Sequence, residues 1–546
     1  MRARIQDGIV YSPYPDLEEL TDSSIFAFLE RRLRKHGDKT ALIHGKDSIS
    51  YSQLLERLRA TAACFHSHGV CKGDRVLVHV KNGIDGFVAA CSIPLTGATL
   101  VTSDVTFSED ELLDHAMKTD ATLVVTDETY FELFKRIAPR LKFKKYFSLT
   151  DIPGCTTVGT YPCNQAAEYK EALGCDDNVL FVAHSTGTTG VSKIIEITQR
   201  NFLSQICCRE YFRLATTDDV CLGGGNISFY VCFTYSFFVV SIGATLVLLD
   251  SYNPIPDVFT ALRDHKVNVV HATPMKLLQI VFEMKKIGGS FPHVKKLTTL
   301  GTSLSEKIKS EILSAFSPLE IRSCYGMTEV SGYLSAPPCG EFAVGDVGFP
   351  VSSTRMKILD STTGTVLGPN QSGEVFFYTP HFMVGYYKDP AETASFTNSE
   401  GWVRTGDLGH YNEDGRLFIT GRVKAATLPA VLRSGLPEVE ECLHFHPSIA
   451  EAAVVPIVGA QGEGHLAAVV VPRPEQKPSL ELAEHIKSFV KENLPSVSQV
   501  EAGIFFTDAI PRSGFGKIKR RLLREQMGKL ERTDSPNCKS SAGSFS

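Results

Sequence analysis

The sequence lacks an excess of charge of either sign and any long, uninterrupted apolar run. Its 56 Lys and Arg residues nearly balance 61 Asp and Glu residues, giving a formal net charge of -5, so no overall field favours nucleic acid or an anionic membrane as a partner. The longest apolar stretch, residues 229–249, is broken by serine, threonine and glycine, and it therefore predicts no transmembrane segment. This balance fits an enzyme that acts on small molecules.

Cysteine pairs at metal-binding or redox spacing are also missing, as is an apolar leader. The 14 cysteines include the adjacent Cys207 and Cys208 but no C-x-x-C motif, so we expect reduced thiols, without disulfides or zinc. The N-terminal residues, MRARIQDGIVYSPYP, contain no apolar segment, and residues 544–546 differ from the Ser-Lys-Leu peroxisomal signal. We expect a cytoplasmic protein.

The length and the texture of the chain indicate several α/β units. A chain of 546 residues is too long for one core. Up to about residue 400, short apolar runs such as residues 75–80 alternate with amphipathic, helix-length stretches such as residues 51–66, as in folds built from crossover units. We predict an α/β fold: a large, multi-subdomain N-terminal α/β domain (1–421), a smaller mobile C-terminal α+β domain (422–528) and a disordered polar tail (529–546).

Residues 185–193, STGTTGVSK, combine small, hydroxyl and basic side chains directly after an apolar run. Glycines let backbone N–H groups approach a phosphate closely, hydroxyls add donors and Lys193 adds positive charge. The segment is not a Walker A loop, because Val191 and Ser192 separate the lysine from the glycine. Taken alone, it is a nucleotide loop or a flexible turn between two strands. The predicted phosphate-binding residues are Ser185, Thr186, Gly187, Thr188, Thr189 and Gly190, with Lys193 as a catalytic residue.

Four segments, in order and in spacing, resemble those of the AMP-forming adenylate superfamily, which includes acyl-CoA synthetases, 4-coumarate-CoA ligases and firefly-type luciferases. They are STGTTGVSK at 185–193, SCYGMTE at 323–329, GWVRTGDLG at 401–409 and PRSGFGKIKRR at 511–521. GTSLS at 301–305, GEVFFYTPHFMVGYYKDP at 373–390 and GRVK at 421–424 are weaker matches. The resemblance extends over about residues 20–528.

The resemblance implies where ATP and Mg²⁺ are held. A tyrosine ring can lie against a purine, small neighbours can leave room for it, and carboxylates can bind Mg²⁺ or accept hydrogen bonds from ribose hydroxyls. Taken alone, YGMTE could be a strand end and TGD a turn, but their order favours the nucleotide site. The residues implied at the nucleotide are Gly301, Thr302, Tyr325, Gly326, Met327, Asp407 and Arg422. Thr328 and Glu329 are implied as catalytic residues, with Glu329 as the metal ligand.

The C-terminal motif contributes a lysine to the implied reaction. Lys517 is implied to bridge the substrate carboxylate and the α-phosphate during adenylation, and Lys424 occupies the position of the interdomain hinge. The basic residues around Lys517 could suggest RNA, but they lack interleaved aromatic residues, so a solvated helix face is favoured.

In the aromatic cluster of residues 229–238, most side chains are expected to belong to the core. Only Ser228, Phe229 and Tyr230 are assigned to the acyl or aryl pocket.

The implied function is ATP-dependent activation of a carboxylic acid to an acyl-adenylate, followed by transfer to coenzyme A. The chain departs from the family pattern after the hinge, where Ala430 and Val431 replace a Lys-Gly pair and Pro429 precedes them. If this segment pairs as a strand, proline removes a donor and valine adds bulk, which predicts weak use of coenzyme A. Two alternatives follow: an adenylate-forming enzyme with another acceptor, including luciferase-like oxidation, and a non-catalytic nucleotide- or acyl-binding relative.

Overall fold

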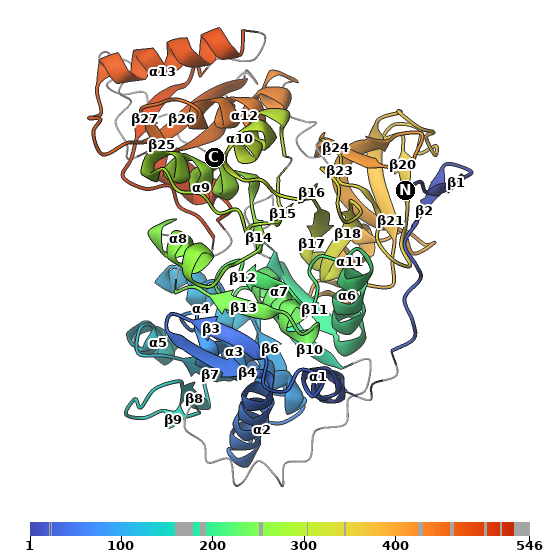
Figure 1. Cartoon of the computed structure of the whole chain (residues 1–546), viewed down its shortest axis with the longest axis vertical. Coiled ribbons are helices and arrows are strands. Elements are labelled where there is room, and N and C mark those ends of the chain that lie inside the picture. The colour runs from blue at the N-terminus through green and yellow to red at the C-terminus, as the bar shows by residue number, and fades with distance from the viewer. Residues whose placement is uncertain are drawn as a thin grey trace. The chain divides into compact units, whose positions relative to one another are not determined.

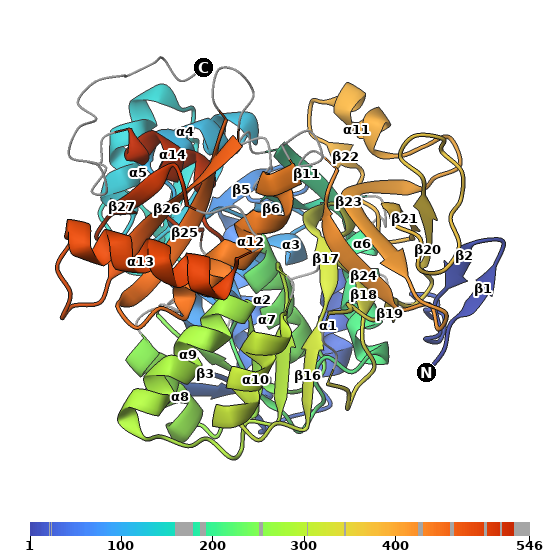
Figure 2. The ribbon, with the colours of Figure 1, turned by 90° about the horizontal axis from the view of Figure 1, so that it is seen from above.

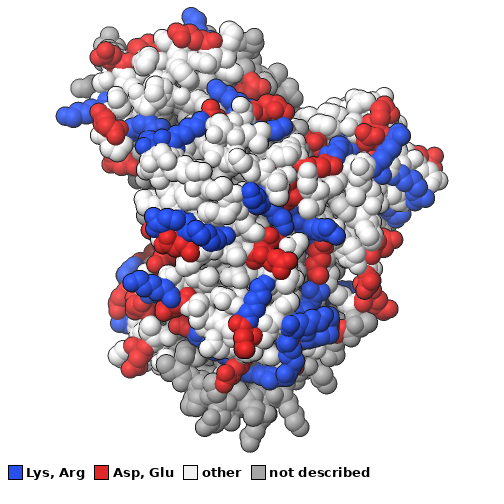
Figure 3. Space-filling view, viewed as in Figure 1, with Lys and Arg blue, Asp and Glu red and all other residues white. Residues whose placement is uncertain are grey.

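The structure, a computed structural model, describes residues 1–546 except 21, 23, 159–177, 186–192, 251–254, 303, 343–344, 424–429, 459–463, 496–499, 514–515 and 529–546. The chain divides into two compact units, Met1–Thr420 and Gly421–Ser546, which we call the N-terminal and C-terminal units (Figure 1). Basic and acidic side chains are interspersed on the face drawn in Figure 3. No helix in the described part of the chain is long and apolar enough to cross a membrane.

The N-terminal unit contains two large, mainly parallel sheets. The first has the order β22-β11-β10-β6-β5-β7-β8-β9 and is parallel from β10 to β9. The second has the order β16-β15-β14-β12-β13-β3-β4 and is parallel except for the β3–β4 pair. The strands of the first sheet are β5 (Arg75–Val78), β6 (Thr99–Val101), β7 (Leu123–Thr126), β8 (Lys145–Ser148), β9 (Thr156–Thr157), β10 (Val179–Ser185), β11 (Lys193–Thr198) and β22 (Gly385–Tyr386). Those of the second are β3 (Thr40–His44), β4 (Asp47–Ser50), β12 (Val220–Leu222), β13 (Thr245–Leu248), β14 (Val269–Ala272), β15 (Lys296–Thr299) and β16 (Glu320–Ser323).

Helices connect the strands of these sheets, as the alternating sequence pattern predicts. Ser108 caps one of them: its Oγ accepts from Glu111 N at 3.2 Å, and the Glu111 carboxylate accepts from Ser108 N at 2.8 Å. This confirms the capping box read from the sequence. The helices are α1 (Ile25–Leu33), α2 (Tyr51–Ser67), α3 (Ile84–Leu95), α4 (Glu109–Lys118), α5 (Phe131–Ile137), α6 (Gln199–Tyr211), α7 (Tyr230–Ser241), α8 (Ile255–Asp264), α9 (Pro274–Ile287), α10 (Glu306–Ala315) and α11 (Pro390–Phe396), with 3-10 turns η1 (Ala138–Arg140) and η3 (Thr328–Val330).

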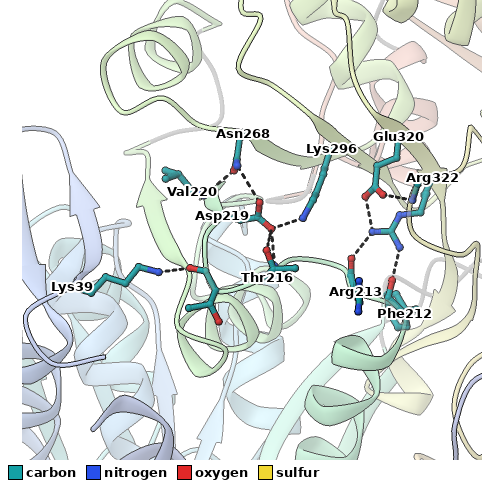
Figure 4. A network of polar contacts seen from close by, with 12 residues as sticks. Lys39, Phe212, Arg213, Thr216, Asp219, Val220, Asn268, Lys296, Glu320 and Arg322 are labelled. Atoms are coloured by element: carbon teal, nitrogen blue, oxygen red, sulfur yellow. Dashed lines mark hydrogen bonds and ion pairs between the residues drawn. The ribbon is translucent and has the colours of Figure 1, made fainter. Parts of the chain in front are cut away.

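A polar network ties together the amino ends of three parallel strands in the second sheet (Figure 4). The Asp219 carboxylate, just before β12, accepts from Asn268 Nδ2 at 3.0 Å and from Lys296 Nζ at 2.6 Å. Asn268 precedes β14 and Lys296 begins β15. The carboxyl ends of the parallel strands lie at the opposite edge, where ligands bind in open α/β sheets.

The remainder of the N-terminal unit is β-rich, as expected after residue 373. One sheet has the order β1-β2-β20-β21-β23-β24, and a second has the order β17-β18-β19. The first consists of β1 (Arg4–Gln6), β2 (Ile9–Tyr11), β20 (Arg355–Leu359), β21 (Gly373–Tyr378), β23 (Val403–Tyr411) and β24 (Leu417–Arg422), whose last two residues belong to the C-terminal unit. The second consists of β17 (Tyr325–Met327), β18 (Gly332–Ala336) and β19 (Phe349–Pro350).

The C-terminal unit is a small α+β fold built on three strands, β25 (Ile449–Val458), β26 (Gly464–Pro472) and β27 (Gly503–Phe506). One apolar cluster joins these strands to α12 (Ala430–His444) and α13 (Leu480–Asn493), and another joins them to α14 (Arg520–Met527). Because strand residues alternate between the two clusters, the helices cover opposite faces of the sheet (Figure 2).

One premise of the sequence analysis about this unit is wrong. Ala430 and Val431 begin helix α12, whereas the sequence argument for weak coenzyme A use assumed a paired strand in that segment. The helix is fixed by apolar side chains that recur farther along it, such as Val439 and Leu443, which enter the core of the unit. The argument that Val431 disturbs strand pairing and so weakens coenzyme A use therefore does not apply.

Candidate active site

Two of the predicted nucleotide segments meet directly. Tyr325 follows strand β16, and its hydroxyl donates a hydrogen bond to the carboxylate of Asp407 in β23, 82 residues farther along the chain. The Tyr325 ring lies 6.2 Å from the Phe377 ring at an interplanar angle of 27°. Asp407 is only 4 % exposed. The site thus places an aromatic ring and a buried carboxylate side by side.

Gly326 has a structural role in addition to the predicted one of leaving room for a base. A Cβ at this position would lie 1.9 Å from the carbonyl oxygen of Gly332. The absence of a side chain therefore lets β17 and β18 approach each other, as their antiparallel pairing requires. Met327, the next residue, packs against the core of the unit.

Glu329 and Lys193 lie on either side of a tyrosine that the sequence analysis did not select. Glu329, in η3, is buried, and its Oε1 accepts a hydrogen bond from Tyr386 Oη at 3.0 Å. Burial and the nearby Glu329 raise the pKa of Tyr386, so the phenol stays neutral and donates. Lys193 Nζ lies 4.6 Å from the centre of the same ring and forms an ion pair with Glu392.

Tyr386 and Glu392 belong to the segment GYYKDPAET, whose first part was noted only as a weak family match and from which neither residue was selected. Strand β22, which contains Tyr386, pairs with β11, the strand that begins at Lys193. Glu392 lies in the first turn of α11. The contact thus depends on a pairing across almost 200 residues, and no local pattern indicates it.

Three further predicted residues lie in the segments that follow β15 and β16. Thr328 begins η3, and its carbonyl accepts from Ser331 N at 2.9 Å. Gly301, with a φ of +99°, and Thr302 follow β15 and are exposed. Because β15 and β16 are parallel neighbours, the turn at Gly301 and the segment that starts at Tyr325 leave the sheet at the same edge.

The phosphate loop is described only at its ends. Ser185 ends β10 and Lys193 begins β11, and the two residues are partners in the antiparallel pair. This pairing is common to both interpretations of the loop, a nucleotide loop and a turn between strands. Thr186, Gly187, Thr188, Thr189, Gly190 and the predicted hinge residue Lys424 lie outside the described residues.

The predicted substrate wall is held by backbone contacts at its first residue. Ser228 Oγ accepts from Val80 N at 3.1 Å and donates to Val80 O at 3.2 Å. Phe229 packs edge-on against His184, with ring centres 5.4 Å apart, and Tyr230 is buried at the start of α7. Ser228 therefore anchors the segment, and the two aromatic residues are its packing surfaces.

The two remaining predicted residues belong to the C-terminal unit. Lys517 is exposed in a tight turn, in which Ser513 N donates to Lys517 O at 2.8 Å and Gly516 N donates to Ser513 O at 2.7 Å. Arg422 is the exposed last residue of β24. Both residues lie at the surface of their unit.

Fold and site together define a two-unit α/β enzyme whose candidate active site lies at the carboxyl ends of parallel strands. The chain belongs to the family of AMP-binding enzymes: the family's main sequence model matches residues 29–387, and the model of the AMP-binding enzyme C-terminal domain matches residues 438–517. This confirms the predicted adenylate-forming superfamily.

Relatives of known activity match over nearly the whole chain. Luciferin 4-monooxygenase of Photuris pensylvanica is 25 % identical, over 96 % of this chain and 98 % of its own length. The 4-coumarate–CoA ligase 1 of Petroselinum crispum is 25 % identical, over 96 % and 97 %. A solved benzoate CoA ligase from Burkholderia xenovorans LB400 has a TM-score of 0.77 at 22 % identity, covering 92 % of this chain and 99 % of its own. The fold class is thereby confirmed.

Proposed function

We propose that this protein activates a carboxylic acid with ATP and then transfers the acyl group to coenzyme A. In the first step, a carboxylate oxygen forms a bond to the α-phosphorus, the bond to the β-phosphate oxygen breaks, and pyrophosphate leaves. The observation that carries the proposal is the cluster of Lys193, Tyr386 and Glu329 beside the Tyr325–Asp407 pair. It combines a cation, a carboxylate and an aromatic ring, which a nucleotide triphosphate requires.

In this proposal the nucleotide lies against Tyr325, near Gly301 and Thr302, and its ribose hydroxyls donate to Asp407, with Arg422 as a further donor. Thr328 and the loop residues Ser185, Thr186, Gly187, Thr188, Thr189 and Gly190 donate to phosphate oxygens. Lys193 and Lys517 stabilise the negative charge that develops as the two anions meet. Phe229 and Tyr230 border the acid.

The residues present fit a magnesium ion that is shared with the phosphates. Glu329 offers a buried carboxylate, and no cluster of three His, Cys, Asp or Glu side chains occurs among the described residues. Mg²⁺ is commonly held by one or two carboxylates together with substrate phosphates. Bound there, it would neutralise phosphate charge, and Tyr386 would keep the Glu329 carboxylate in place.

Asp407→Ala is expected to weaken ATP binding by roughly 10- to 100-fold, because hydrogen bonds to a charged group contribute about 1.5–3 kcal/mol each. Calorimetric titration with ATP measures the change, with Tyr325→Phe as the matched variant that removes only the phenol donor to Asp407. If Asp407→Ala is folded and binds ATP like the parent, the ribose does not lie at this carboxylate.

Coenzyme A is expected to be the acceptor, because the strand-pairing objection does not apply to the helical segment at Val431. Pyrophosphate release and product chromatography with a panel of acids, with and without coenzyme A, test this. We expect acyl-CoA to form as fast as pyrophosphate. Adenylate without acyl-CoA would indicate another acceptor, such as oxidation in a luciferase-like reaction. The absence of pyrophosphate with every acid would indicate a non-catalytic relative.

A further inference from the structure

A buried arginine lies beside the predicted substrate wall. Arg209, on α6, is only 2 % exposed, and its Nη1 donates to the carbonyl of Thr234 in α7 at 2.7 Å. Its Nη2 donates to Thr234 Oγ1 at 3.1 Å and reaches the carbonyl of Ser331 at only 3.5 Å. Its Nε is buried without a hydrogen-bond partner among the described residues. The edge formed by Nε and Nη2 is therefore the weakly used side of the guanidinium.

The described groups around Arg209 supply no negative charge. Its guanidinium carbon lies 5.1 Å from the centre of the Tyr333 ring and 5.9 Å from that of Phe238. Burial raises the pKa of the Tyr230 and Tyr333 phenols, so both stay neutral. No described carboxylate forms an ion pair or a hydrogen bond with Arg209. A buried cation without a counter-ion is costly in a low-dielectric interior.

Another fully buried arginine among the described residues is compensated differently. Arg322, on β16, forms an ion pair at 2.8 Å with the buried carboxylate of Glu320 on the same strand, and it also donates to the carbonyls of Phe212 and Arg213 (Figure 4). At Arg322 a carboxylate neutralises the buried guanidinium in addition to the carbonyl contacts. Arg209, in contrast, has no carboxylate partner among the described residues.

Arg209 lies next to a segment of the candidate active site. Ser331, which Arg209 contacts, follows η3 directly, and η3 contains Thr328 and Glu329. At Gly332 a Cβ would lie 3.0 Å from Arg209 Nη2, so the lack of a side chain there gives the guanidinium access to this turn. Arg209 therefore lies between α7, which begins at Tyr230, and the segment that carries the proposed metal ligand.

We propose that Arg209 binds the second carboxylate of a dicarboxylic acid while the first carboxylate is adenylated. This inference rests on the acid activation proposed above and names the class of acid. A carboxylate takes an arginine edge with two parallel hydrogen bonds, and the Nε–Nη2 edge is the one that this structure leaves weakly used. An acid with an apolar far end would leave the guanidinium without a counter-ion.

Matched pairs of acids test the proposal: dicarboxylic acids of four to eight carbons, and monocarboxylic acids of the same lengths. For the best length, we expect kcat/KM for pyrophosphate release to favour the dicarboxylic acid by at least about 10-fold. Arg209→Met should lower this value for the dicarboxylic acid by roughly 100-fold and change it for the monocarboxylic acid by less than about 3-fold. Arg200→Met, an exposed arginine on the same helix, should leave both values unchanged.

A purely structural role for Arg209 gives a different result. Arg209→Met would then lower kcat/KM equally for both acids, and the proposal would be wrong, as it would if the parent preferred monocarboxylic acids at every length. Arg209→Lys keeps the charge but not the two-donor edge. Its kcat/KM should lie between those of the parent and Arg209→Met for dicarboxylic acids only, and it replaces the Met variant if that variant does not fold. Calorimetric titration with the dicarboxylic acids separates this proposal from acid activation. If no acid releases pyrophosphate, binding of a dicarboxylic acid to the parent but not to the Arg209 variants still supports the site. Equal binding of the acid to parent and variants, or no binding to the parent, overturns the proposal.

Discussion

Lys517→Ala is expected to slow acid-dependent pyrophosphate release by roughly 10²- to 10³-fold and to leave ATP affinity nearly unchanged. Adenylation brings two anions together, and a preorganised cation at the reacting oxygens stabilises the transition state more than the bound nucleotide. The lysine lies on a turn closed by hydrogen bonds between Ser513 and the backbone of residues 516 and 517. This backbone geometry does not depend on the lysine side chain, so the substitution should remove charge without unfolding the turn.

Arg521→Ala is the matched control for this prediction. Arg521 belongs to the same basic motif, is exposed and lies 3.7 Å from Glu525 in a surface ion pair, which contributes little to stability. Single-turnover measurement of pyrophosphate release and titration with ATP compare the two variants with the parent. If Lys517→Ala releases pyrophosphate at the parent's rate, or if Arg521→Ala is impaired as strongly, the charge of Lys517 is not specific to adenylation.

Glu329→Gln should lower turnover by roughly 10²-fold and raise the Mg²⁺ concentration needed for half-maximal rate. The amide keeps the size of the side chain and can still accept from Tyr386, but it loses the charge that holds a divalent cation. Tyr386→Phe should act in the same direction with a smaller effect, about 5- to 10-fold, because it removes one hydrogen bond that orients the carboxylate.

Magnesium titrations of the pyrophosphate-release rate distinguish these effects. Glu400→Gln is a suitable control, because Glu400 is exposed and only 3.5 Å from Lys357 in a surface ion pair. If the rate of Glu329→Gln depends on the Mg²⁺ concentration as that of the parent does, the metal is held elsewhere. An unchanged curve in Tyr386→Phe alone would leave Glu329 as the ligand and remove the positioning role of the tyrosine.

Features that depend on neighbouring residues could be predicted from the sequence. The Ser108 capping box needs only residues three positions apart, and the α/β class follows from apolar runs separated by helix-length intervals. The motif residues were found for a related reason, since Tyr325, Glu329 and Asp407 stand in short segments with a recognisable order. The pairing of Tyr325 with Asp407 confirms that two of these segments meet.

Contacts that depend on distant strand pairing could not be predicted. Tyr386 reaches Glu329 and Lys193 only because β22 joins β11, and nothing near residue 386 specifies that partner. Gly326 shows the same limit: the sequence analysis gave it the task of leaving room for a purine, and its close backbone approach to Gly332 appears only in the structure. At Val431 the family pattern suggested a strand, but the apolar positions that follow in this chain favour a helix.

The contacts of Lys193 have a consequence for the entropy of nucleotide binding. A free lysine side chain samples many rotamers, and fixing them costs up to about 1.5–2 kcal/mol. Here Glu392 and the ring of Tyr386 already hold the ammonium group, at a strand end whose backbone is fixed by β10. Folding has therefore ordered this side chain before a nucleotide arrives. A phosphate that takes the place of the Glu392 carboxylate exchanges one anion for another and need not immobilise a flexible chain.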